Sequence, residues 1–102
     1  MVSTQLTLDH LRKAGYPLVQ VVERWNAFAR VRQDLFQIID VLAVGEDIVG
    51  VQTTTASNVS KRVRKITDSE ALPILRKAGI RVVVHGWRKR KGRWVLREVD
   101  IS

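Results

Sequence analysis

Cysteine is absent from this chain of 102 residues. Its absence excludes a disulfide-stapled scaffold and any metal site with thiolate ligands. Together with an N-terminal segment too polar for a secretory signal, it predicts a cytoplasmic protein. The chain also lacks a Gly-rich phosphate loop, a Gly-x-Ser-x-Gly motif and a histidine pair at metal-binding spacing. Dinucleotide binding, NTP hydrolysis and serine- or zinc-dependent hydrolysis are therefore not predicted.

Long apolar runs are missing too, since none approaches the roughly 20 residues that a membrane helix needs. Acidic residues are few: 10 Asp and Glu stand against 18 Lys and Arg, for a formal net charge of +8. A positive field attracts polyanions, and contacts to phosphates release counterions from nucleic acid. Charge therefore favours DNA or RNA as the partner. A membrane surface is disfavoured because no long helix combines a basic face with an aromatic one.

The pattern of apolar residues predicts one domain over residues 1–102, with elements in the order α-β-β-β-α-β-β. We expect an α/β (α+β) fold in which helices pack on a single mixed sheet. The expected helices cover residues 4–14 and 58–66, with a further helical segment ending near 78. The expected strands cover residues 17–25, 36–44, 48–54, 80–85 and 94–101, and residues 26–32 are ambiguous.

Asp40 interrupts the apolar run of residues 36–44. Burying an unpaired carboxylate is costly, so Asp40 needs a cation, a metal ion or a neutral form unless it sits at the surface or in a structural ion pair. A turn at residues 45–47 would bring Asp40 close to Gln52 on the next strand, where Gln52 and Thr54 share one face. Oxygen ligands of this kind suit Mg²⁺, which activates water and neutralises phosphoryl charge.

This arrangement resembles the PD-(D/E)XK nuclease superfamily, whose core is a helix, a three-stranded meander, a helix and a further strand. The resemblance implies a restriction-endonuclease-like fold and cleavage of DNA with Mg²⁺ or Mn²⁺, as in restriction enzymes and Holliday junction resolvases. It places the family's aspartate at Asp40 and its second acid at Gln52. A main-chain carbonyl ligand would come from Thr53, and an additional acid from Glu23.

The sequence departs from the family at three positions. Ile39 replaces the proline before the aspartate, Gln52 carries no charge, and Thr54 stands where the family has lysine. The missing ammonium group would have to come from Lys61 or Lys65 on the following helix. Asp34 is better explained as a cap or an ion-pair partner than as a site residue.

Two basic segments are candidates for nucleic-acid contact. Arg62 and Lys65 lie on the helix that would border the site. The last turn carries five cations between Trp87 and Trp94, a pattern that can stack on bases and hold phosphates, although core tryptophans and solvated charges are the alternative. His85 is expected to pack and hydrogen-bond rather than to act as a base. The cations of the turn are Arg88, Lys89, Arg90, Lys91 and Arg93.

Two functions remain open at this point. The first is a metal-dependent DNA endonuclease or resolvase-like hydrolase, in which Asp40, with Gln52 and Glu23, binds the ion and Lys61 stabilises charge. The second is a catalytically inactive DNA- or RNA-binding module on the same fold. Thr54 in the lysine position favours the second, and an acid retained in an apolar segment favours the first. A homodimer is compatible with both.

Overall fold

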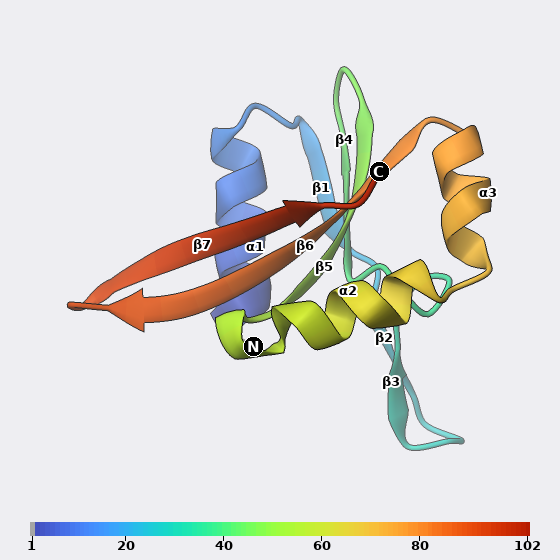
Figure 1. The fold of residues 1–102 in the computed structure, drawn as a ribbon, viewed down its shortest axis with the longest axis horizontal. Coiled ribbons are helices and arrows are strands. Elements are labelled where there is room, and N and C mark those ends of the chain that lie inside the picture. The colour runs from blue at the N-terminus through green and yellow to red at the C-terminus, as the bar shows by residue number, and fades with distance from the viewer. Residues whose placement is uncertain (1) are drawn as a thin grey trace.

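The computed structural model describes residues 2–102, in which five strands form a mixed sheet in the order β1-β4-β5-β6-β7 (Figure 1). All neighbouring strands are antiparallel except β5 and β6, which run parallel. A second sheet holds only β2 and β3. The elements are α1 (Val2–Lys13), β1 (Leu18–Val21), β2 (Arg24–Asn26), β3 (Val31–Gln33), β4 (Val41–Val44), β5 (Ile48–Thr55), the 3₁₀ turn η1 (Ala56–Asn58), α2 (Val59–Thr67), α3 (Ala71–Lys77), β6 (Ile80–Arg90) and β7 (Arg93–Asp100).

Helix α1 covers one face of the sheet. Leu11 packs with the inward-facing valines and alanine of the central strands, and Leu8 joins them at the edge. Gly15 follows the helix with a φ of 101°, where a side chain would strain the backbone, and the N–H of Tyr16 closes the last turn on the carbonyl of Leu11. The helix expected over residues 4–14 is confirmed as α1 (Val2–Lys13).

Helices α2 and α3 cover the opposite face. Val59 and Ile66 of α2 pack with Val82 and Val84 of β6 in one buried cluster. The contact is close because of Gly86: a Cβ there would lie 2.1 Å from Cγ2 of Val59. The helix expected over residues 58–66 is confirmed as α2, whose apolar residues Val59 and Ile66 face the sheet while its lysines are exposed.

Residues 36–44 do not form a single strand, so that expectation is wrong. Only Val41–Val44 joins the sheet, and Phe36 and Gln37 turn the chain with φ angles of 53° and 66°. Successive side chains of a strand point to opposite faces, whereas Ile38 and Ile39 are both buried in the α2 cluster. Burying both isoleucines on one side requires the turn, and Asp40 therefore precedes β4 rather than lying inside it.

The single strand expected over residues 17–25 is also wrong. The chain leaves the main sheet after β1, where the N–H groups of Val22 and Glu23 both donate to the carbonyl of Asp40. It then forms the β2–β3 hairpin, which includes the residues that sequence left unassigned and which projects away from the sheet (Figure 1).

The final hairpin is longer and tighter than expected. Strands β6 and β7 pair up to Arg90 and Arg93, which leaves Lys91 and Gly92, with φ angles of 50° and 77°, as a two-residue turn. The coarse prediction, helices on a mixed sheet, is confirmed. Among the described helices, none has the length and apolar character to cross a membrane.

Candidate functional site

Three carboxyl groups meet where the small hairpin joins the main sheet. Glu23 precedes β2, Asp34 follows β3, and Asp40 precedes β4. One oxygen of each lies within 4.8 Å of one oxygen of both others. Asp40 is 5% exposed, and the other two are half-buried. We call these three residues the acid cluster.

The neighbouring strand β5 holds the acid cluster from one side. The main-chain N–H of Thr53 donates to Oδ2 of Asp40 at 2.9 Å. The amide Nε2 of Gln52 donates to Oδ1 of Asp40 at 3.2 Å and to Oδ2 of Asp34 at 2.9 Å. The predicted proximity of Asp40 and Gln52 is confirmed, and the hairpin register that produces it pairs Val41 with Val51.

The acid cluster is electrostatically unbalanced. Burial is the largest cause that raises the pKa of the Asp40 carboxyl. The hydrogen bond with Asp34 and the charges of Asp34 and Glu23 act in the same direction, the N–H of Thr53 opposes them, and the net pKa is about 8. An ionised Asp40 in this position therefore needs a compensating cation. The cluster therefore favours either an extra proton or a bound positive ion.

Nearby cations reach two of the three acids. The Nζ atom of Lys65 on α2 lies 3.7 Å from Oδ2 of Asp34, and Arg32 pairs with Glu23 at 2.8 Å. Within residues 2–102, no basic side chain pairs with Asp40. Lys61 lies exposed on α2 without an ion pair in the described part of the chain, so Lys65, not Lys61, is the lysine at the acid cluster.

The donor set fits a hard divalent cation. Mg²⁺ and Mn²⁺ prefer carboxylate and carbonyl oxygens, and the acid cluster supplies oxygens from three side chains. In addition, Oε1 of Gln52 is buried with no hydrogen-bond partner among the described residues. A buried acceptor without a donor is costly. Because Nε2 of the same amide faces Asp34 and Asp40, Oε1 would become a ligand of an ion in the acid cluster only after the amide rotates.

The other predicted site residues have different positions. Thr53 reaches Asp40 through its main-chain N–H, while its side chain lies on the opposite face of the sheet and contacts Thr7. Thr54 shares the face of Gln52 and is buried, but no hydrogen bond joins it to the acid cluster within residues 2–102. Thr54 therefore lies on the expected face of β5, but its side chain carries no charge.

The expected ion pair of Asp34 is confirmed, and its partner is Lys65. Sequence reasoning did not place Asp34 beside Asp40 and Gln52, where the structure has it. The short spacing from Asp34 to Asp40 was the available signal. A strand beginning at Phe36 would have carried the two acids apart, whereas the observed turn folds them together.

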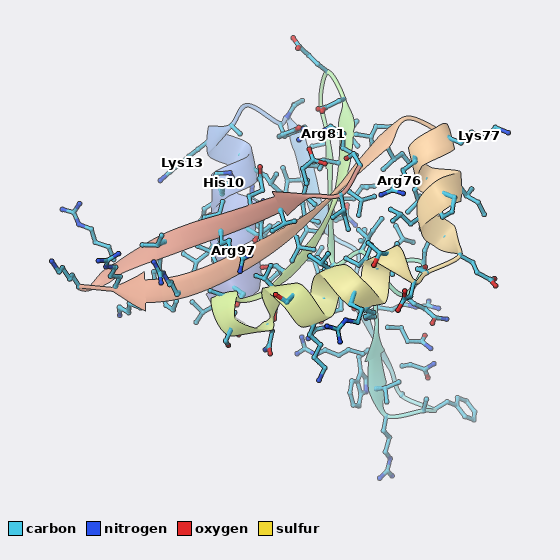
Figure 2. All side chains as sticks on the ribbon, viewed as in Figure 1. His10, Lys13, Arg76, Lys77, Arg81 and Arg97 are labelled. Atoms are coloured by element: carbon cyan, nitrogen blue, oxygen red, sulfur yellow. The ribbon has the colours of Figure 1, made fainter. Side chains whose placement is uncertain are left out.

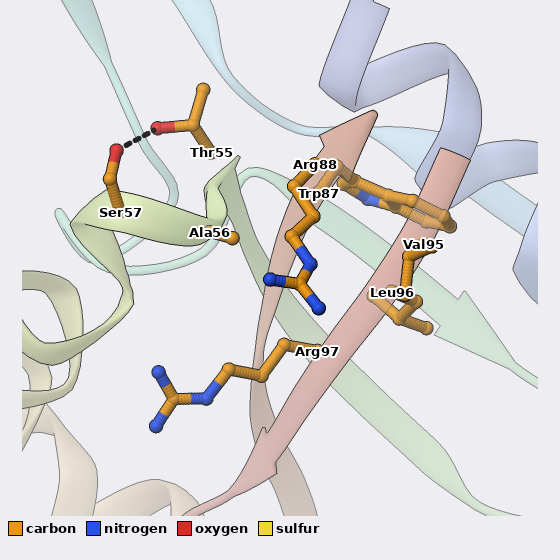
Figure 3. A pocket seen from close by; sticks show the side chains of 8 residues that line it. All are labelled: Thr55, Ala56, Ser57, Trp87, Arg88, Val95, Leu96 and Arg97. Atoms are coloured by element: carbon orange, nitrogen blue, oxygen red, sulfur yellow. Dashed lines mark hydrogen bonds between the residues drawn. The ribbon is translucent and has the colours of Figure 1, made fainter. Parts of the chain in front are cut away.

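A hollow on the α2 side of the sheet gathers further positive charge. Figure 3 shows the side chains of Arg88 and Arg97 extending into the space beside η1, while the hydroxyl groups of Thr55 and Ser57 point toward each other. Arg97 pairs with Gly86 in the β6–β7 ladder, so it shares the face on which Gly86 meets α2. Arg97, labelled on β7 in Figure 2, was not predicted from sequence.

The tip of the β6–β7 hairpin is exposed and basic. Lys89 lies over the ring of Trp94, with its Nζ atom 5.6 Å from the ring centre. Trp87 is 7% exposed and Trp94 is 43% exposed, so the expectation of two core tryptophans holds only for Trp87. Arg90, Lys91 and Arg93 are exposed at the turn.

His85 lies on the α1 face, opposite the acid cluster. It is fully buried, with Nδ1 3.1 Å from the hydroxyl of Thr7 and Nε2 2.8 Å from a carboxylate oxygen of Glu98. Burial lowers the pKa of His85, against the opposing effect of its hydrogen bond to Glu98. His10 packs edge-on against it. The expectation that His85 packs and hydrogen-bonds is confirmed.

Comparisons with models of protein families, with curated proteins and with solved structures found no match. The geometry of the acid cluster and the distribution of charge are therefore the observations that bear on function.

Proposed function

We propose that this chain is a divalent-metal-dependent DNA nuclease of the PD-(D/E)XK type. The observation that carries the proposal is the convergence of Glu23, Asp34 and Asp40 beside the buried amide of Gln52. A binding module gains nothing from three carboxyl groups in a positively charged protein, because acids repel the phosphates that the rest of the surface attracts.

The topology supports this proposal. Strands β1, β4 and β5 form an antiparallel meander after α1, and β6 follows α2 and α3 and lies parallel to β5. This order resembles that of the superfamily core, apart from the β2–β3 hairpin between the first two strands and the additional helix α3 before β6. The acid cluster lies at the meander, where the superfamily carries its metal ligands.

The chain's own residues have distinct roles in this proposal. Glu23, Asp34 and Asp40 would hold Mg²⁺ or Mn²⁺, with Gln52 as a neutral ligand. Once bound, such an ion lowers the pKa of a water molecule and neutralises charge on a phosphodiester. The N–H of Thr53 fixes the direction of the Asp40 carboxylate. The Thr53 carbonyl stays a candidate ligand, as the resemblance implies.

Lys65 takes the place of the missing family lysine. Its Nζ atom lies 3.7 Å from Asp34, whereas the lysine position itself holds Thr54. An ammonium group there can hold a phosphate oxygen or orient a water molecule beside the acids. We therefore assign to Lys65 the charge-stabilising role that sequence had divided between Lys61 and Lys65.

DNA would lie across the α2 side of the sheet. Arg62 and Lys65 on α2 and the two arginines of the hollow lie on this side, and the β6–β7 tip extends the basic surface beyond it. These side chains would contact phosphates, which give affinity without reading sequence. RNA offers the same phosphates, and the assay below includes it as a substrate.

The test is cleavage of supercoiled plasmid, four-way-junction DNA and single-stranded RNA with Mg²⁺, Mn²⁺ or EDTA. We expect metal-dependent cleavage of DNA by the wild type and a loss of at least about 100-fold in Asp40→Asn, because one carboxylate ligand is gone. Asp68→Asn is the matched control, since Asp68 is an exposed acid outside the cluster.

One other candidate is favoured by a specific observation. Thr54 in place of the family lysine is compatible with a nuclease fold that only binds nucleic acid. Salt-sensitive DNA binding with no cleavage by the wild type in either metal would contradict the nuclease and favour this binding module.

A further inference from the structure

The β2–β3 hairpin exposes aromatic side chains on a projection. Its two strands pair only with each other, and Figure 1 shows them extending away from the five-stranded sheet. Phe28 in its loop is 103% exposed and Trp25 on β2 is 61% exposed, with Val31 open beside them. Phe28 contributes nothing to packing, and Trp25 leaves most of its surface in solvent, so burial in the core does not explain these aromatic side chains.

The tip of the hairpin has a defined shape. The side-chain oxygen of Asn26 accepts hydrogen bonds from the N–H groups of Phe28 at 3.0 Å and Ala29 at 3.1 Å. Arg30 closes the loop in a left-handed conformation with a φ of 53°. A loop held in one conformation presents its aromatic residue with little ordering entropy left to lose on binding.

The charge of the hairpin selects the kind of partner. Residues 24–33 contain Arg24, Arg30 and Arg32 but no acidic residue. Two copies of this hairpin would repel each other, whereas a nucleic acid would meet cations for its phosphates and aromatic rings for its bases. Stacking of bases on aromatic side chains beside arginines is the general mode of binding unpaired nucleotides.

The hairpin also leads directly into the acid cluster. Glu23 immediately precedes β2 and Asp34 immediately follows β3, so both ends of the projection are cluster residues. At about 3.3 Å per residue, the four steps from Arg30 to Asp34 span roughly 13 Å. This length corresponds to about four stacked nucleotides at 3.4 Å each.

We propose that the β2–β3 hairpin is a wedge whose residues Trp25 and Phe28 stack on unpaired or unstacked bases, so that the chain selects locally opened DNA. The position of the cut rests on the proposed nuclease function, whereas the preference for binding opened DNA does not depend on cleavage. Under it, cuts fall within about four nucleotides of the opened bases.

The test compares binding to a perfect duplex and to the same duplex with a central mismatched bubble, by fluorescence anisotropy in EDTA. We expect the wild type to prefer the bubble and Phe28→Ala to lose about 5- to 100-fold in affinity for it, with less than about twofold change on the duplex. Phe28→Tyr, which keeps the ring, should retain the preference. Ile74→Ala is the control: it removes another exposed apolar side chain, on α3, and should change the affinity for neither the bubble nor the duplex.

Three results would overturn the wedge. They are a wild type without preference for the bubble, an equal loss on both DNAs in Phe28→Ala, and a Phe28→Ala protein whose main change is loss of self-association in sedimentation. Plasmid cleavage by the same proteins separates the two proposals. Bubble preference without cleavage keeps the wedge and contradicts the nuclease, and cleavage without bubble preference does the reverse.

Discussion

Asp40 is buried beside two other carboxyl groups, and its ionised form opposes folding. Desolvation is the largest cause, and the neighbouring acids add to it. A group of this kind is retained at the expense of stability, which is typical of residues kept for chemistry. The cost has a measurable pH dependence.

Because the pKa of Asp40 is raised to about 8, the folded chain holds this proton more tightly than the unfolded chain does. The stability from that proton is complete below the unfolded pKa, near 4, and is lost as the pH rises toward 8. In EDTA, we expect the free energy of unfolding of the wild type to fall by about 4 kcal/mol between pH 5 and pH 8.5, because one proton contributes about 1.4 kcal/mol per pH unit over about three units. Asp40→Asn should lose less over the same range and be the more stable protein at pH 8.5.

Urea denaturation at the two pH values measures both quantities, with Asp68→Asn as the control that keeps the wild-type pH dependence. Parallel pH profiles for the wild type and Asp40→Asn would show that Asp40 ionises freely in the folded state.

At the scale of single residues, sequence located half of the site. Asp40 and Gln52 could be paired because strand alternation and a short turn fix which side chains meet. Asp34 could not, since the turn that returns it to Asp40 uses positive φ angles at Phe36 and Gln37, residues that carry no turn signal. The need to bury both Ile38 and Ile39 on one face is a tertiary constraint.

Among the elements, the β6–β7 hairpin is the clearest phosphate-binding candidate. Its tip lies at one end of the molecule, far from Lys77 on α3 at the other end (Figure 2). Replacing Lys91 by Asn, which tolerates the left-handed conformation, and Arg93 by Gln removes two charges without straining the turn.

We expect this double variant to bind duplex DNA more weakly and to reduce the slope of log affinity against log salt by about 1–2, since each phosphate contact contributes about 0.9. Anisotropy titrations at several salt concentrations measure the slope. Lys77→Gln should leave the slope unchanged. An unchanged slope in the double variant, or an equal fall in Lys77→Gln, would exclude the tip as a specific contact.

Elements differed in how far sequence could define them. The basic helix was expected over 58–66 and is α2 (Val59–Thr67), because its apolar stripe and charged face are both strong signals. The β2–β3 hairpin was not expected, since its residues bury no core face and therefore show no alternation of apolar and polar positions.

Over the whole molecule, the two faces of the sheet have different contents. On the α1 face, the polar side chains of His85 and Trp87 are both hydrogen-bonded to the buried hydroxyl of Thr7. The α2 face holds the acid cluster, its lysine and the arginine hollow. The chain has a net charge of +8, yet three of its 10 acidic residues lie together in the acid cluster. This local concentration of negative charge is the main departure from the basic character of the molecule.

Calorimetric titration of Mn²⁺ into the metal-free protein tests this account most directly, because it requires neither DNA nor turnover. The account predicts one saturable site per chain, weakened at least about tenfold in each of Glu23→Gln, Asp34→Asn and Asp40→Asn, and unchanged in Asp68→Asn. A wild type without saturable binding, or a site indifferent to Asp40→Asn, would contradict it.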